Sequence, residues 1–282
     1  MNIIGLGNAG CGIAKEFEQY PQYEVYKIDV GIEGQRCYPF PECQTAEECE
    51  STDLPLLKDF FKDLEGPTTF IVGGSGKISC ASLRILEAIK DRPLSLLYIK
   101  PDTSLMGEVQ LMRERVVFGV LQEYARSGVF EEMRIISNEA LDDVIGGAPI
   151  LGYYEELNKS LVGTLHMLNV FDNSDPIVGS REPPYLTHRI STVGICYANS
   201  MHEIMLFSLD NPREKCYIYG VSEEKLRNDK TLLKKITNQV KAKMKKDLKV
   251  TYAVYSVPYS DSFVYVVERT PHIQLQNNLE KK

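Results

Sequence analysis

Apolar residues in the first half of the chain occur in short runs that alternate with amphipathic stretches. The short runs are rich in β-branched residues and predict buried strands at Asn2–Leu6, Tyr23–Val30, Thr68–Val72, Leu94–Ile99 and Met133–Ile136. Apolar positions at helical spacing predict helices at Ile13–Gln19, Leu54–Leu64, Ser79–Lys90, Val109–Arg126 and Tyr153–Leu168. We expect an irregular loop over residues 31–52, which lack a clear period. This alternation predicts an α/β, Rossmann-like, mostly parallel sheet.

The texture changes after the long helix. Residues 169–190 are rich in Asp, Asn and Pro, which is typical of a linker. Beyond them the pattern predicts strands and one basic helix, at Thr192–Ala198, Ile204–Leu209, Cys216–Gly220, Lys230–Lys246, Val250–Val257 and Ser262–Arg269. We therefore expect a first domain at 1–168, a linker at 169–190, a smaller α+β domain at 191–273 and a polar tail at 274–282.

Composition excludes several classes of protein. With 43% hydrophobic and 25% charged residues, the chain is typical of a globular protein, and no apolar run approaches the roughly 18 residues of a membrane span. A net charge of -7 argues against general nucleic-acid binding. The seven cysteines include no C-x-x-C pair, so we expect reduced thiols and no metal site. We expect a cytoplasmic protein, because no signal sequence begins the chain.

A glycine-rich segment follows the first predicted strand and precedes a helix. Its spacing, Gly5-x-Gly7-x-x-Gly10, with Asp29 about 20 residues further on, is that of a dinucleotide-binding loop. Glycines let the backbone approach a pyrophosphate, and the helix N-terminus attracts its charge. An NAD-dependent oxidoreductase is therefore one hypothesis. A tight strand-to-helix turn without a ligand is the alternative.

A second glycine-rich segment, Gly73-Gly74-Ser75-Gly76-Lys77, again joins a predicted strand to a helix. Two such loops at one sheet edge can enclose a polyphosphate. The segment is not a Walker A loop, because that motif requires glycine at position 71 and Ser or Thr at position 78, where isoleucines stand. Lys77 is either a phosphate contact or a solvated loop lysine.

The order of these motifs resembles the tubulin/FtsZ superfamily. The segment from Gly7 to Phe17 resembles the first phosphate loop of that family, and Gly73–Gly76 resembles the core of its glycine-rich signature. The resemblance implies phosphate contacts from both loops, by Gly7, Asn8, Ala9, Gly10, Cys11, Gly73, Gly74, Ser75, Gly76 and Lys77. Val72, Lys77 and Ile78 replace flanking residues of the signature.

Three later segments extend the resemblance. Ile99-Lys100-Pro101 resembles the end of an FtsZ strand, and the segment around Asn138 resembles a nucleoside-contacting segment. Tyr154-Glu155-Glu156-Leu157-Asn158 resembles a tubulin segment whose tyrosine stacks on guanine and whose asparagine bonds it. Four-residue spacing puts Tyr154 and Asn158 on one helical face. The alternative is a core tyrosine and an exposed asparagine.

In the tubulin/FtsZ family, the loop after the long helix completes the catalytic site of the next subunit. The resemblance implies catalytic roles for Asp172 and Asp175, which would orient the attacking water. The alternative is an interdomain turn. Residues 31–53 lack the glycine-rich phosphate-sensing loop of the family, so we predict nucleotide binding more firmly than turnover.

The resemblance implies a filament-forming, tubulin-like or FtsZ-like cytoskeletal protein, and leaves its activity as a GTPase open. We expect GTP or GDP and Mg²⁺ as cofactors and head-to-tail contacts with other copies of the chain. An adaptor protein is a further possible partner. A scaffold that does not hydrolyse GTP is the alternative, besides the oxidoreductase. The basic helix is most simply a solvated surface, and an anion-binding face is its alternative.

Overall fold

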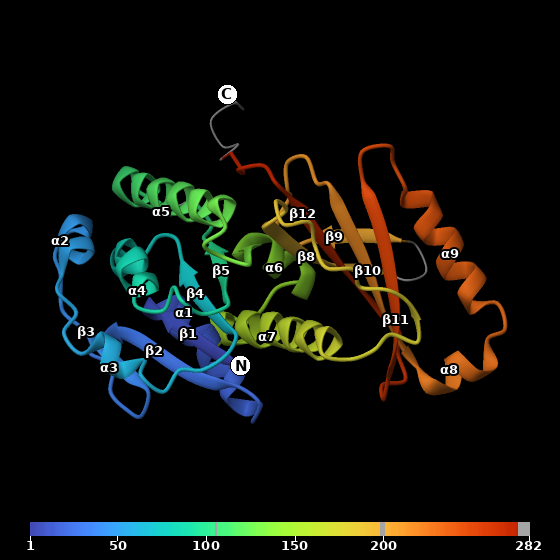
Figure 1. Cartoon of the computed structure of the whole chain (residues 1–282), viewed down its shortest axis with the longest axis horizontal. Helices are drawn as coiled ribbons and strands as arrows, with labels where there is room; N and C mark the ends of the chain where they lie inside the picture. Colours follow the sequence, from blue (N-terminus) through green and yellow to red (C-terminus); the bar gives the residue numbers. More distant parts are fainter. Residues whose placement is uncertain (105, 198–200, 276–282) are drawn as a thin grey trace.

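The computed structural model describes residues 1–104, 106–197 and 201–275. Ala198, at the end of one predicted strand, and residues 276–282 of the predicted tail lie outside the described residues. Twelve strands form one mixed sheet in the order β3-β2-β1-β4-β5-β6-β8-β12-β10-β11-β7, with β9 beside β8 (Figure 1). The predicted fold class, a mostly parallel α/β sheet followed by a smaller region, is confirmed.

The first part of the sheet is parallel throughout. Its strands are β1 (Asn2–Leu6), β2 (Glu24–Val30), β3 (Cys37–Phe40), β4 (Thr68–Gly73), β5 (Leu94–Lys100) and β6 (Glu132–Ser137). Its helices are α1 (Gly7–Glu16), η1 (Phe17–Gln19), α2 (Ala46–Ser51), α3 (Leu57–Phe60), η2 (Lys77–Ala81), α4 (Ser82–Glu87), α5 (Glu108–Ser127) and α6 (Asn138–Ile145). Alternate strand residues face opposite sides. Ile4 and Phe70 pack with α4 and α5, whereas Ile3 and Ile71 pack with α1 and α7.

A 20-residue helix, α7 (Tyr153–Asp172), joins the two parts of the molecule. The second part comprises β7 (Val178–Gly179), β8 (Ile190–Tyr197), β9 (His202–Met205), β10 (Glu214–Ser222), α8 (Glu223–Asn228), α9 (Leu232–Lys243), β11 (Lys249–Val257) and β12 (Phe263–Thr270). Most neighbouring strands here are antiparallel, and β10 with β11 is the parallel exception. Leu161 and Leu165 of α7 share one core with Ile218 of β10, so α7 is buried against both parts.

Several elements differ from the sequence-based expectation. The helix predicted at Leu54–Leu64 is the four-residue α3, and a 3₁₀ turn replaces the first part of the helix predicted at Ser79–Lys90. Residues 31–52 are not an irregular loop, because they contain β3 and α2. The long helix continues past Leu168 to Asp172. No helix among the described residues is long and apolar enough to cross a membrane.

Candidate functional site

The two glycine-rich segments lie side by side at the carboxyl edge of the sheet. They follow β1 and β4, which are parallel neighbours with Leu6 opposite Val72. A Cβ atom added to Gly73 would lie 3.1 Å from the Cβ of Ala9, so the two turns are in van der Waals contact. The arrangement required for both turns to hold one ligand is therefore present.

The first turn is the N-terminus of α1, which begins at Gly7 and not at Ile13 as predicted. Leu6 precedes the helix without a side-chain cap, and the first turn holds no acidic residue. The first N–H groups of a helix have no partner within the helix, and the helix dipole adds positive potential there. Asn8 and Ala9 are exposed at this end. The site offers uncapped amide donors to an anion.

Two glycines beneath this turn have packing roles that need no ligand. A Cβ on Gly10 would lie 2.5 Å from the carbonyl oxygen of Ile71, and a Cβ on Gly5 would clash with the carbonyl oxygen of Gly10. Only glycine lets α1 approach β1 and β4 this closely. Gly7 differs, because its φ of 69° is left-handed and marks the turn itself. The dinucleotide spacing therefore has a structural cause in this chain.

The Cys11 thiol is directed away from this edge. Its Sγ donates to the carbonyl oxygens of Gly5 at 3.3 Å and Ile28 at 3.4 Å, beneath α1. Burial raises the pKa of Cys11 to about 12, so the side chain is a neutral thiol. Cys11 would therefore face a ligand only with its backbone.

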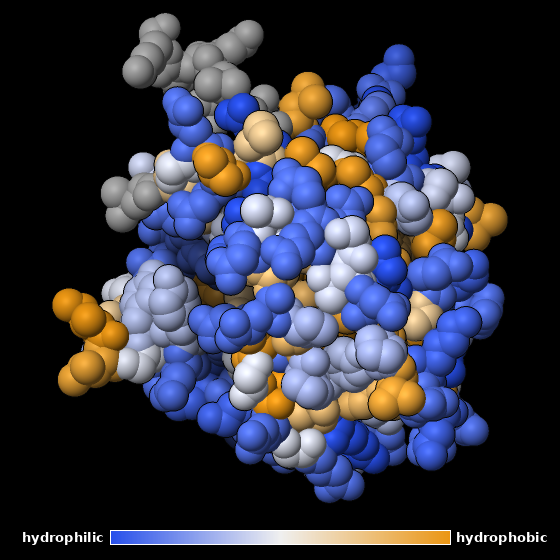
Figure 2. Space-filling view, turned by 90° about the vertical axis from the view of Figure 1, so that its left-hand side faces the viewer, coloured by the Kyte–Doolittle hydropathy of each residue, from blue (hydrophilic) through white to orange (hydrophobic). Residues whose placement is uncertain are grey.

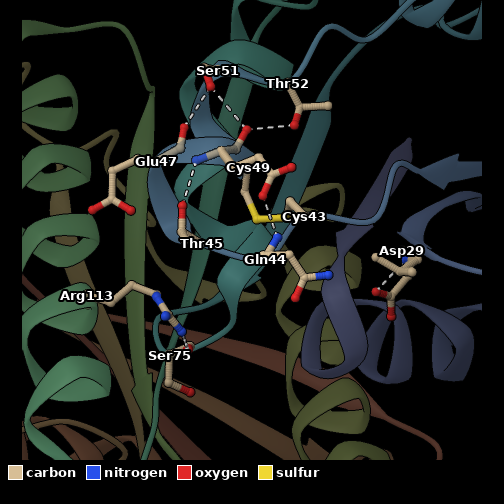
Figure 3. Close-up of a disulfide and its surroundings, with 12 residues drawn as sticks. Asp29, Cys43, Gln44, Thr45, Glu47, Cys49, Ser51, Thr52, Ser75 and Arg113 are labelled. Atoms are coloured by element: carbon tan, nitrogen blue, oxygen red, sulfur yellow. Dashed lines mark hydrogen bonds between the residues drawn. A yellow bond between two sulfur atoms is a disulfide. The ribbon is translucent and has the colours of Figure 1, made fainter.

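The second turn, from Gly73 to Gly76, is held by polar contacts from three directions. Ser79 Oγ donates to the carbonyl of Gly73 at 2.5 Å, and the Gly74 N–H donates to the carbonyl of Ile99 at 3.2 Å. Arg113 donates to the carbonyl of Ser75 at 3.2 Å (Figure 3). Lys77 is exposed where η2 begins. The turn is therefore positioned before any ligand arrives.

A buried ion pair supports the second turn from below and was not expected from the sequence. Glu114 of α5 is fully buried, and its Oε1 accepts from Lys100 Nζ at 3.0 Å and from Tyr98 Oη at 3.1 Å. Gly74 packs directly on the Tyr98 hydroxyl, where no Cβ would fit. One sequence signal was available: Glu114 lies on the same face of α5 as the buried residues Val117, Phe118 and Leu121.

The start of α7 lies beside α1. Asn158 Nδ2 is 3.1 Å from the point that a Cβ on Gly12 would occupy, so the amide rests against the α1 backbone. Tyr154, one turn earlier, is 67% exposed, and its ring packs edge-to-face on the Tyr153 ring with 5.2 Å between the centroids. A hollow of about 400 Å³ adjoins it, lined by Ile150, Gly152, Tyr153, Tyr154 and Glu155. Asn138 begins α6 at the carboxyl end of β6, the same edge of the sheet.

The other end of α7 reaches the opposite edge of the sheet. A 20-residue helix is about 30 Å long. Near its end the His166 ring stacks on Tyr20 at 3.8 Å, and Asn169 donates to the Tyr23 hydroxyl at 3.1 Å. Tyr23 directly precedes β2, so Asp172 lies at the amino ends of the strands. The predicted catalytic aspartates therefore lie far from the glycine-rich turns of their own chain.

Asp172 is engaged by a neighbour that the sequence did not reveal. Arg181 NH1 lies 2.5 Å from its Oδ1. Partial burial raises the pKa of Asp172, and the charge of Arg181 opposes that shift. Asp175, three residues later, is exposed. A carboxylate pair is thus available at this edge, with one member held in an ion pair.

The expected set of reduced thiols is wrong at two positions, because Cys43 and Cys49 form a disulfide. The bond links Cys43, just before α2, to the fully buried Cys49 within α2, and Thr45 caps the first turn of this helix (Figure 3). Arg84 of α4 donates to the carbonyl of Glu50 at 3.0 Å. The segment from Cys43 to Cys49 is therefore closed by a disulfide, and α2 packs against η2 beside the second turn.

The geometry defines a class: an α/β protein with two amide-rich turns at one sheet edge and a long helix joining them to a second, mainly antiparallel region. No protein-family model and no curated protein sequence matches the chain. Among solved structures, the W319Y mutant of FtsZ from M. jannaschii superimposes with a TM-score of 0.69 at 12% identity, over 95% of this chain and 90% of that chain.

TubZ structures are equally similar. A helical model of the TubZ-Bt four-stranded filament gives a TM-score of 0.72 at 14% identity, over 95% of this chain and 85% of that chain. A GTPγS-form protofilament of Bacillus thuringiensis serovar israelensis TubZ gives 0.67 at 13% identity, over 94% and 86%. The chain therefore has the tubulin/FtsZ fold, as the order of its motifs implied.

Proposed function

We propose that the protein binds GTP or GDP at the carboxyl edge of its sheet and assembles head to tail into filaments. The observation that carries the proposal is the contact between two uncapped, amide-rich turns, with the Tyr154 and Asn158 end of α7 on the same side of the sheet. Backbone amides at a helix N-terminus suit phosphate oxygens. The fold that the chain shares with FtsZ and TubZ supports this assignment.

Each candidate residue then has a role in nucleotide binding. The backbone from Gly7 to Cys11 and from Gly73 to Lys77 would bind the phosphates, with the Lys77 ammonium as an additional charge. Asn138 would contact the nucleoside, Asn158 the guanine edge, and Tyr154 the guanine face. Mg²⁺ would neutralise phosphate charge when bound. The described residues hold no cluster of three or more metal-ligating side chains, and Mg²⁺ bound mainly by phosphates and water needs none.

Hydrolysis, in this proposal, takes place only between two copies. Asp172 and Asp175 of one copy would approach the phosphates held by the next copy and orient the attacking water. The length of α7 supports this arrangement, because about 30 Å separate the two ends of the helix. A heterologous contact of this kind repeats into an open filament.

Two observations favour the second candidate, a filament scaffold without turnover. Arg181 holds Asp172 in an ion pair and partly neutralises the carboxylate that would act on water. If the resemblance places the sensing loop correctly, the disulfide-closed segment 43–49 stands in its place and supports the same alternative. Both candidates share the nucleotide site and differ only in hydrolysis.

Thermal unfolding with different nucleotides tests the proposal. Ligand at about 100 times its Kd stabilises a protein by about 2.7 kcal/mol, so GTP and GDP should raise the Tm by several degrees. ATP and NAD should not, because the predicted base contacts are specific for guanine. Stabilisation by NAD without an effect of GTP would refute the assignment. A phosphate-release assay on the same samples separates turnover from scaffolding.

A further inference from the structure

The face of α9 carries positive charge that its own chain leaves largely unbalanced. Between residues 230 and 249 there are eight lysines and a single acidic residue, Asp247. Three of the lysines form ion pairs: Lys235 with Asp229, Lys243 with Glu203 and Lys249 with Glu182. Five form no ion pair within the described part of the chain: Lys230, Lys234, Lys241, Lys245 and Lys246.

A hollow adjoins one of these lysines, Lys241. It encloses about 370 Å³ between α9 and the β7–β11 edge of the sheet, and Val240, Met244, Val250 and Tyr252 contribute apolar lining. Lys241 lies at the same hollow, and Met244 is 58% exposed. The face therefore combines cationic side chains with space for one apolar side chain, and an acidic partner that carries an exposed apolar residue would be complementary to both.

The opposite end of the molecule has the complementary charge. Residues 41–53 contain five acidic residues and no lysine or arginine: Glu42, Glu47, Glu48, Glu50 and Asp53. All five are exposed, and none forms an ion pair within the described residues. The Cys43–Cys49 disulfide fixes the backbone that carries them. Figure 2, which looks onto this end, shows a mainly hydrophilic surface with scattered apolar side chains.

One of the apolar side chains at this end is held outward by an unusual backbone. Leu56 has a left-handed φ of 65° and is 72% exposed. A left-handed conformation costs a non-glycine residue about 1–2 kcal/mol. Leu56 closely follows Asp53, so an exposed apolar side chain lies beside the acidic segment. An acidic segment with an apolar side chain is complementary to the lysines and the apolar hollow at α9.

The two surfaces cannot meet within one chain. β3, which precedes the acidic segment, is one edge of the twelve-stranded sheet, whereas α9 covers the other edge at β11 and β7. Figure 1 shows α2 and α9 at opposite ends of the long axis. This axis crosses the strands, whereas the glycine-rich turns and Asp172 are separated along them. A contact between the two surfaces would therefore run sideways to the proposed head-to-tail contact.

We propose that the lysine-rich surface formed by α9 and the residues that follow it, with Lys234, Lys241 and Lys245, binds the acidic α2 end of a second copy of this chain. Leu56 of that copy enters the hollow beside Met244. The contact is heterologous, so it can repeat and would join neighbouring filaments side by side. The role in filaments rests on the proposed function, but the pairing itself needs no nucleotide.

Charge reversal tests the pairing on the full chain without nucleotide. Sedimentation velocity at low salt should show self-association of the wild type that weakens as salt rises. Lys234→Glu/Lys241→Glu/Lys245→Glu should weaken it roughly tenfold or more, and so should Glu42→Lys/Glu47→Lys/Glu50→Lys. Both sets in one chain, or an equimolar mixture of the two variants, should restore association. Restoration also shows that the variants fold.

Leu56→Gly provides a second test of the same contact. Glycine accepts the left-handed backbone, so the free energy of unfolding should not fall, while self-association should weaken severalfold.

A wild type that stays monomeric at every salt concentration would overturn the proposal, as would variants that the reciprocal reversal does not rescue. Binding of a labelled DNA duplex that the α9 reversal abolishes, with self-association unchanged, would assign the face to nucleic acid instead. Guanine-dependent Tm shifts, measured separately, report on the proposed function alone.

Discussion

The two ends of α7 differ in how they are built. At its start, Asn158 rests on the α1 backbone, near two turns that present backbone amides and the exposed Lys77. At its end, Asp172 lies among charges, with Arg181 in contact and Glu132 close enough to affect its pKa. One end is suited to hold an anion and the other to supply carboxylates. Since a 20-residue helix separates them, the proposed catalytic aspartates of one copy cannot reach the proposed nucleotide site of the same copy.

The largest effect is expected at the Asp172 end. Asp172→Ala should lower GTP turnover about 10²- to 10³-fold, because the carboxylate proposed to orient the attacking water is lost. The Kd for GTP should stay within about twofold, because the proposed phosphate site lies at the other end of α7. Single-turnover phosphate release and nucleotide titration measure the two quantities. Equal turnover in variant and wild type would favour the scaffold alternative.

A change of similar size in stability is expected beneath the first turn. Gly10→Val places side-chain atoms on the carbonyl of Ile71 and should cost about 3 kcal/mol of unfolding free energy. Gly119→Ala is the matched control, because nothing lies within 4 Å of its Cβ position in the middle of α5. The control should stabilise by about 0.5–1 kcal/mol. Urea unfolding measures both, and an unaffected Gly10→Val variant would contradict the close packing of α1.

The charged end should also respond to acid. Burial alone would raise the pKa of Glu132, but Arg134 and Arg269 lower it to about 2 from 4.5. This carboxylate stabilises the fold above pH 4.5, and the contribution disappears as the pH falls from about 4.5 to 2. Glu132→Gln should therefore cost about 2–3 kcal/mol at pH 7.

The difference between Glu132→Gln and wild type should shrink toward pH 2. Glu203, whose pKa is also lowered to about 2, is present in both proteins, so its contribution cancels in the comparison. Urea unfolding at several pH values gives the result. A difference that stays constant with pH would show that the ion pairs of Glu132 do not stabilise the fold.

The smallest effect is expected at the start of α7, where Asn158 is proposed to contact the guanine base. Asn158→Ala should weaken GTP binding about tenfold, equivalent to about 1.4 kcal/mol, through loss of hydrogen bonds to the guanine edge. Asn173→Ala makes the same substitution just beyond the other end of α7 and should leave the Kd unchanged. Fluorescence titration with a labelled guanine nucleotide distinguishes them. Equal loss of affinity in both variants would argue against a base contact at Asn158.

The same contrast explains what the sequence could predict. β1 and β4 are buried on both faces, so their apolar runs predict strands in the sequence. The glycines that follow them predict the edge of the sheet. The start of α1 at Gly7 was missed because glycine is a poor helix former, and close packing on β1 and β4 overrides that preference. The local sequence pattern therefore predicts the strands correctly, whereas it does not predict a helix start that depends on close packing.

Contacts between distant residues were not predictable in the same way. Arg181 meets Asp172 only because the chain reverses after α7, and Lys100 meets Glu114 only because α5 packs over β5. The Cys43–Cys49 pair was missed because its spacing of six residues fits no short redox or metal motif. Side-chain partners of this kind depend on tertiary structure that periodicity does not encode.

Mixing two defective copies tests most directly whether the ends of α7 form one site between subunits. Asp172→Ala keeps the nucleotide end, and Tyr154→Ala/Asn158→Ala keeps the aspartates. Each alone should show little turnover at GTP concentrations below the Kd of the double variant. An equimolar mixture should recover about a quarter of wild-type turnover. If the two variants assemble in random order, about one junction in four pairs an intact nucleotide site with intact aspartates. Turnover of the mixture no greater than the mean of its components would contradict the account.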